Sequence, residues 1–129
     1  MKQITDIGIL ILACQKILGM KLPVDIRMST KPRGEVKQYA GLCDGMERKG
    51  VLVRHVLHIN LEMCLFSEYK VADVIAHEMV HACMIEYGKF DSNKHHDTRF
   101  QNLCSLLEIE LKNLGFELGT LYNPDTDTD

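Results

Sequence analysis

The chain has 129 residues, of which 46% are hydrophobic and 26% charged, and its formal net charge is −3. This length corresponds to one domain, which can bury a hydrophobic core without disulfide or metal staples. The slightly acidic balance excludes a strong basic field that attracts nucleic acids, and the longest apolar run, Ile7 to Cys14, is too short to span a bilayer.

The first half of the chain is expected to form one helix and two or three strands. Apolar residues spaced three and four apart predict a helix from Ile4 to Leu18. Alternating apolar and polar residues predict a half-buried strand from Val24 to Ser29, and a weaker strand is expected from Val36 to Leu42. A turn from Asp44 to Gly50 then leads to a third strand, Val51 to Leu61. We expect these strands to form a meander.

The second half is expected to contain two helices. The first runs from about Ser67 to Tyr87, and its apolar residues are not confined to one stripe, so we expect it to be buried on several sides. A polar loop, Lys89 to His95, leads to the last helix, Asp97 to Leu114. Asp97 or Thr98 is suited to cap the start of that helix.

The five cysteines are odd in number and form no C-x-x-C pair. This pattern argues against a disulfide framework and against a zinc ribbon. We therefore expect reduced, mostly buried thiols, with Cys83 and Cys104 as minor alternatives for metal ligands. Because no signal-peptide pattern precedes the first apolar segment, we expect a cytoplasmic protein, or one in the host cytoplasm if a phage encodes it.

The helix predicted over residues 67–87 contains the pattern H-E-x-x-H, at His77-Glu78-Met79-Val80-His81. Residues four apart lie on one face of a helix, so the imidazoles of His77 and His81 can turn toward one point. Neutral histidine nitrogens bind zinc at about 2.0–2.1 Å. Glu78 is rotated off this line, where its carboxylate can reach a metal-bound water without becoming a ligand. This pattern is typical of zinc peptidases.

A catalytic zinc site needs a third protein ligand. His95 and His96 both follow a short loop after the H-E-x-x-H helix, so the returning chain can bring either one to the metal. A glutamate ligand on the last helix would have to be Glu108 or Glu110. Both lie far along that helix, and we expect them to form a solvated acidic face.

With these motifs the chain resembles the SprT-like family of zinc metallopeptidases, which includes the Spartan group. That family has H-E-x-x-H on one helix and a third zinc histidine in an H-G-x-x-F motif that opens the next helix. Here the second motif corresponds to His96-Asp97-Thr98-Arg99-Phe100, with Asp97 in place of glycine. The segment from His58 to Leu61 resembles the strand that precedes the active-site helix in these proteins.

The resemblance extends over Ile4 to Leu114 and implies an α+β fold with a zincin-like core. This core would consist of an N-terminal helix, a small three-stranded antiparallel or mixed sheet, the H-E-x-x-H helix and a C-terminal helix. We expect residues 1–120 to form this minimal catalytic domain. Residues 121–129 are expected to form an acidic, flexible tail.

The resemblance also implies a zinc-dependent endopeptidase. His77, His81 and His96 would bind Zn²⁺, and Glu78 would act as general base toward the attacking water. The strand from about Val53 to Leu61 would line the cleft, and its free edge would pair with an extended protein or peptide substrate. Tyr87 and Tyr122 are minor alternatives for transition-state donors.

The sequence gives weaker indications of binding partners other than the substrate. The family resemblance suggests action on DNA-associated proteins, yet the basic residues cluster only loosely in the strand region, at Lys31, Arg33, Lys37, Arg48, Lys49 and Arg54. DNA contact is therefore expected to be weak or to occur through a partner, and no membrane contact is expected. Two other functions stay open: a zinc-binding protein without turnover, and a peptide-binding module.

Overall fold

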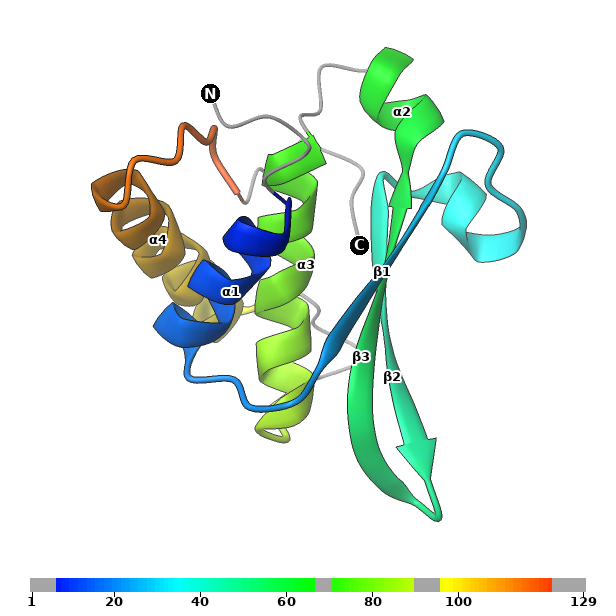
Figure 1. Ribbon diagram of the computed structural model, residues 1–129, viewed down its shortest axis with the longest axis horizontal. Helices are drawn as coiled ribbons and strands as arrows, with labels where there is room; N and C mark the ends of the chain where they lie inside the picture. The colour runs from blue at the N-terminus through cyan, green and yellow to red at the C-terminus, as the bar shows by residue number, and fades with distance from the viewer. Residues whose placement is uncertain (1–6, 67–70, 90–95, 122–129) are drawn as a thin grey trace.

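The computed structural model describes residues 7–66, 71–89 and 96–121. In these ranges the chain forms an α+β fold in which a three-stranded mixed sheet is covered on one side by helices (Figure 1). The elements in chain order are α1 Ile7–Leu18, β1 Val24–Ser29, the 3₁₀ helix η2 Gly34–Gln38, β2 Gly41–Arg48, β3 Val51–Asn60, α2 Leu61–Phe66, α3 Val71–Glu86 and α4 Thr98–Asn113. α3 lies between the sheet and the pair α1 and α4.

The sheet has the order β1-β3-β2, so the expected meander is wrong. β1 runs parallel to β3, with Val24 opposite His55, and β2 runs antiparallel to β3, with Gly41 opposite Ile59. The chain crosses from β1 to the far edge of the sheet through η2 and then returns as β3 between the two earlier strands. Both edges of β3 are therefore paired over residues 55–59, and the expectation that β3 offers a free edge to a peptide is also wrong.

The second strand and the turn after it differ from prediction. Residues 34–38 form η2, and β2 continues through Asp44 and Gly45, which we expected to begin a turn. The turn lies at Lys49-Gly50, where both residues have positive φ angles of 53° and 79°, as a two-residue type I′ hairpin requires. Gly45 pairs with His55, and a Cβ on it would lie 2.7 Å from Leu52 Cδ1. This glycine therefore serves close packing within the hairpin.

α3 is the centre of the core. Every residue from Val74 to Met84 is buried, which confirms the prediction that this helix is covered on several sides. Leu57 and Ile59 of β3 pack on one side of the core, and Leu107 and Leu111 of α4 pack on the other, all fully buried. Each such side chain contributes on the order of 1.5–3 kcal/mol of transfer free energy. The site described below therefore sits on the helix with the longest run of buried residues among those described.

The chain between β3 and α3 contains a helix that we did not predict. The strand expected to reach Leu61 ends at Asn60, whose side-chain oxygen accepts a hydrogen bond from the Met63 N–H at 2.9 Å. This bond satisfies a free donor at the start of α2, as an N-cap does. Residues 67–70, where we expected the long helix to begin, lie outside the described residues.

All five cysteines lie in the described ranges, and none forms a disulfide. Four of them are buried, at positions 14, 64, 83 and 104, as expected. Among the helices that the structure describes, none combines the length and apolar character that crossing a bilayer requires.

Candidate metal centre

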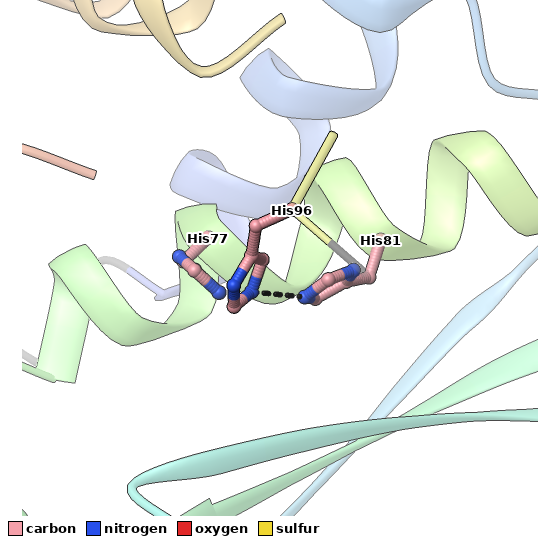
Figure 2. Close-up of side chains that lie close together, drawn as sticks. All are labelled: His77, His81 and His96. Carbon is pink, nitrogen blue, oxygen red and sulfur yellow. Dashed lines mark hydrogen bonds between the residues drawn. The ribbon is translucent and has the colours of Figure 1, made fainter. Parts of the chain in front are cut away.

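Three histidine side chains converge beside the middle of α3 (Figure 2). His77 and His81 lie one turn apart on α3 and are each only 3% exposed, because the surrounding helix is buried on all sides. His96 approaches from the segment just before α4. The three ring centroids form a nearly equilateral triangle with separations of 5.0, 5.1 and 5.1 Å. Residues far apart in the chain are thus brought to one point.

The ring nitrogens have the spacing that a metal ion requires. Nε2 of His81 lies 3.2 Å from Nε2 of His96, and one nitrogen from each of the three rings lies within 4.8 Å of the others. Zinc binds histidine nitrogen at about 2.0–2.1 Å in a tetrahedral arrangement, which places two ligand nitrogens roughly 3.3 Å apart. The three histidines therefore can hold a metal ion, with small adjustments of the rings.

The start of α4 holds His96 in place. Asp97 is the N-cap, and its carboxylate accepts a hydrogen bond from the Phe100 N–H at 3.0 Å. That N–H, together with the neighbouring Arg99 guanidinium, keeps the pKa of Asp97 below its ordinary value. The side-chain amide of Gln101 donates to the His96 carbonyl at 2.9 Å. The carbonyl of His96 and the residue after it are thus tied to the helix, and the capping role expected for Asp97 is confirmed.

Phe100 packs against all three histidines. Its ring is fully buried, and its centroid lies 4.9 Å from that of His77, 4.3 Å from that of His81 and 4.7 Å from that of His96. An apolar ring in this position excludes water from one side of the histidine cluster and limits the rotation of the imidazoles. Phe100, the last residue of the second motif, thus packs as an apolar anchor against the three imidazoles.

A backbone carbonyl fixes the orientation of His77. Nδ1 of His77 lies 2.6 Å from the carbonyl oxygen of Leu121, in a buried contact. A carbonyl can only accept, so Nδ1 must carry the proton and donate it. Nε2 of His77 then carries the lone pair that a metal needs. We did not identify this acceptor from the sequence, because a backbone carbonyl 44 residues away has no sequence signal.

Glu78 lies next to the histidines and is fully buried. β2 passes close to it at Gly41, where an added Cβ would lie 2.9 Å from Cγ and 3.0 Å from Oε2 of Glu78. Burial raises the pKa of the nearby Cys104 thiol, and the carboxylates of Glu108 and Glu78 raise it further. Sequence reasoning missed Gly41 as part of the site, since its glycine reads as an ordinary strand or turn residue.

Several residues that the sequence offered as minor alternatives for ligands or donors make other contacts in the structure. The Cys83 thiol donates to the Leu18 carbonyl at 3.6 Å, and the Tyr87 hydroxyl donates to the Gly19 carbonyl, so both side chains contact the end of α1. The half-buried Glu108 accepts a hydrogen bond from the Leu121 N–H, so the expectation of a solvated Glu108 is wrong, whereas Glu110 is exposed. His95 and Tyr122 lie outside the described residues.

The sequence model of the SprT-like family matches residues 19–117. This range contains the whole sheet, α3, α4 and the three converging histidines. A search of curated proteins finds no significant match to the chain.

Proposed function

Because the chain belongs to the SprT-like family, we propose that it is a zinc-dependent endopeptidase acting on protein or peptide substrates. The observation that carries the proposal is the convergence of three imidazoles at one point beside a buried glutamate. A metal cation held by the three imidazoles would attract a carboxylate beside it, and this attraction is stronger in a buried site than in water. The family membership and the chemistry of the cluster support the same conclusion.

His77, His81 and His96 would hold the zinc ion. Imidazole is a preferred zinc ligand, and three protein ligands that leave a fourth position open are typical of catalytic sites, whereas structural sites are closed by four. A bound zinc ion supplies two things: it lowers the pKa of a coordinated water, and it polarises the carbonyl that is attacked. The 3.2 Å separation of the His81 and His96 nitrogens supports this assignment.

Glu78 would act as the general base. It follows His77 directly, so its carboxylate points to the side of the two ligand rings on α3 and can take a proton from the attacking water. The same carboxyl group would then give that proton to the leaving amine. Its complete burial keeps bulk water from competing for the proton, which favours this role.

β2 is the strand best placed to bind an extended substrate. Its inner edge pairs with β3, its outer edge is unpaired among the described residues, and its first residue, Gly41, lies against Glu78. A peptide that adds to the outer edge through main-chain hydrogen bonds would run past the glutamate. The substrate edge that we assigned to β3 is thus reassigned to β2.

Proteins associated with DNA remain candidate substrates because of the family. A direct contact with DNA would be weak, since the basic residues are few and one of them, Arg54, is paired with Asp25 at 2.8 Å. Salt-dependent retention of the protein on DNA is the measurement that supports a direct contact.

The test uses zinc-loaded protein and an unfolded protein substrate. Wild type should cleave it, a chelator should stop cleavage, and added zinc should restore it. Glu78→Gln should retain one equivalent of zinc and lose hydrolysis by about a hundredfold or more, because general-base catalysis contributes roughly 10²–10⁴ in rate.

Three outcomes would contradict the proposal. Full activity in Glu78→Gln would remove this residue from the mechanism. Stoichiometric zinc without cleavage of unfolded or DNA-bound protein would favour a zinc-binding protein that does not turn over. Peptide binding that survives chelation would favour a binding module.

A further inference from the structure

Glu108 lies on α4, whereas His77 lies on α3. Glu108 nevertheless contacts Leu121, whose carbonyl orients His77. We propose that Glu108 is a positioning residue for the metal site, acting through residues 116–121, here called the C-terminal segment. The proposal rests on the proposed function only in so far as the histidines bind zinc. It assigns a role to a carboxylate outside both family motifs.

The C-terminal segment contacts His77 directly. The Leu121 carbonyl accepts the His77 Nδ1 proton at 2.6 Å, inside the protein. Such outer partners select the tautomer and the ring orientation of a metal ligand. The position of the Leu121 carbonyl therefore decides where Nε2 of His77 points.

Glu108 contacts the same residue, Leu121, through its backbone N–H. The carboxylate Oε1 of Glu108, on α4, accepts a hydrogen bond from the Leu121 N–H. The two backbone polar groups of Leu121 thus point to two functional partners, one carboxylate and one imidazole. A hydrogen bond to a carboxylate is stronger than one between neutral groups, so it holds the peptide plane between Thr120 and Leu121. The Leu121 carbonyl lies in the next peptide plane, and fixing the Leu121 N–H limits the positions that this carbonyl can reach.

The rest of the C-terminal segment is anchored by a hydrogen bond to α3 and by buried apolar side chains. Gly119 N–H donates to Asp73 Oδ1 at 2.9 Å, and Asp73 lies on α3 one turn before His77. Phe116 and Leu121 are each 4% exposed and belong to the hydrophobic core. The segment is therefore held at both ends and follows α3 from Asp73 to His77.

These contacts connect α4 to the metal site by a second route. His96 stands just before α4 and reaches the site directly, whereas Glu108 lies further along α4 and reaches it through Leu121. The position of α4 would thus set both the third ligand and the orientation of the first. Loss of the Glu108 contact should leave the fold intact but free the Leu121 carbonyl to move away from His77.

The test compares Glu108→Ala, Glu108→Gln and Glu110→Ala in the full chain. Zinc affinity is measured by competition with a chromophoric chelator. Glu108→Ala should bind zinc about tenfold more weakly, at the low end of the 10–100-fold effect of losing an outer partner, because it acts one residue removed. Glu108→Gln retains an oxygen that accepts the Leu121 N–H and should stay close to wild type. Glu110→Ala, exposed on the same helix, is the matched control.

A second readout does not depend on zinc. Nitrogen NMR of the zinc-free protein, at a pH where histidines are neutral, should show His77 as the Nδ1–H tautomer in wild type and Glu108→Gln. Glu108→Ala should show a mixture of tautomers. This readout stays informative if zinc binding or peptidase activity is absent, so failure of the proposed function can be told apart from failure of the inference.

Three results would overturn the inference: wild-type zinc affinity and tautomer in Glu108→Ala, a loss in Glu108→Gln equal to that in Glu108→Ala, or an equal loss in Glu110→Ala. If Glu108→Ala does not fold, Asp73→Ala, which removes the acceptor of the Gly119 N–H, is compared with Asp73→Asn, which keeps an acceptor oxygen, by the tautomer readout. A wild-type tautomer in Asp73→Ala would show that anchoring of the C-terminal segment does not position His77.

Discussion

Gly41 on β2 and Glu78 on α3 are so close that a Cβ at position 41 would lie 2.9 Å from Cγ of Glu78. The same Cβ would lie 2.5 Å from Cγ1 of Val74, one turn earlier on α3. The backbone of an edge strand thus approaches the helix that carries the proposed base without any side chain between them. This contact limits the space that the side chain of Glu78 can occupy on the side of β2.

Gly41→Ala should reduce peptide hydrolysis and lower stability. The added methyl overlaps Val74 and Glu78, and overpacking of this kind costs about 1–3 kcal/mol. The carboxylate has to move, so hydrolysis should fall while zinc stoichiometry stays at one. The measurements are kcat/KM, zinc content and thermal unfolding of the same preparation.

The matched control is Gly8→Ala. Gly8 lies in α1, and an added Cβ there meets no atom within 4 Å. This change should leave hydrolysis unaltered and stabilise the helix by roughly 1 kcal/mol, the difference in helix propensity between alanine and glycine. An equal loss of activity in both variants would mean that Gly41 has no specific relation to Glu78.

His96→Ala should lose zinc, whereas His95→Ala should keep it. His96 contributes a nitrogen 3.2 Å from that of His81, and its removal leaves two histidines, which is too few for tight zinc binding. Zinc content by elemental analysis checks this directly. Full zinc in His96→Ala together with loss in His95→Ala would move the third ligand by one residue.

Zinc should also raise the thermal stability of wild type but not of His96→Ala. A ligand that binds only the folded state stabilises it by about 4 kcal/mol at a thousandfold excess over Kd. Thermal unfolding with and without chelator measures the shift. A zinc-dependent shift of equal size in His96→Ala would mean that the stabilising metal binds elsewhere.

Much of the helical part of this fold could be predicted from sequence. Periodic apolar residues predicted α1, α3 and α4, because a helix packed on one or more sides must repeat its apolar positions every three or four residues. The i, i+4 spacing of His77 and His81 predicted their convergence for the same reason. Asp97 was predicted as a cap because its side chain satisfies a free N–H group.

The parts that could not be predicted depend on the backbone or on tertiary contacts. Gly45 was interpreted as a turn residue, but it lies in β2 because the hairpin packs tightly there. The parallel pairing of β1 with β3 depends on a crossover, which alternation within a strand does not encode. His77 is oriented by the backbone carbonyl of Leu121. Every residue has such a carbonyl, so only its position in the fold, and not the residue type, shows this role.

The stability of the fold at acid pH should depend on Glu86. Glu86, at the end of α3, accepts hydrogen bonds from the N–H groups of Lys21 at 2.8 Å and Leu22 at 3.3 Å, and its Oε1 lies 3.0 Å from Nε2 of the buried His55. Burial raises the pKa of this carboxyl, but these partners lower it by more, so the net shift is below the ordinary 4.5. The carboxylate thus joins α3, β3 and the chain after α1.

A carboxyl group with a lowered pKa in the folded state stabilises that state above the pKa of the unfolded chain. This contribution is lost as the pH falls below 4.5 and through the folded-state pKa of Glu86. Glu86→Gln cannot titrate, so its free energy of unfolding should fall less steeply over that range than that of wild type. Chemical denaturation of zinc-free protein at a series of pH values measures this difference without interference from metal release. The exposed Glu62→Gln is the control, and a pH profile of Glu86→Gln that matches wild type would exclude Glu86 as a source of the acid sensitivity.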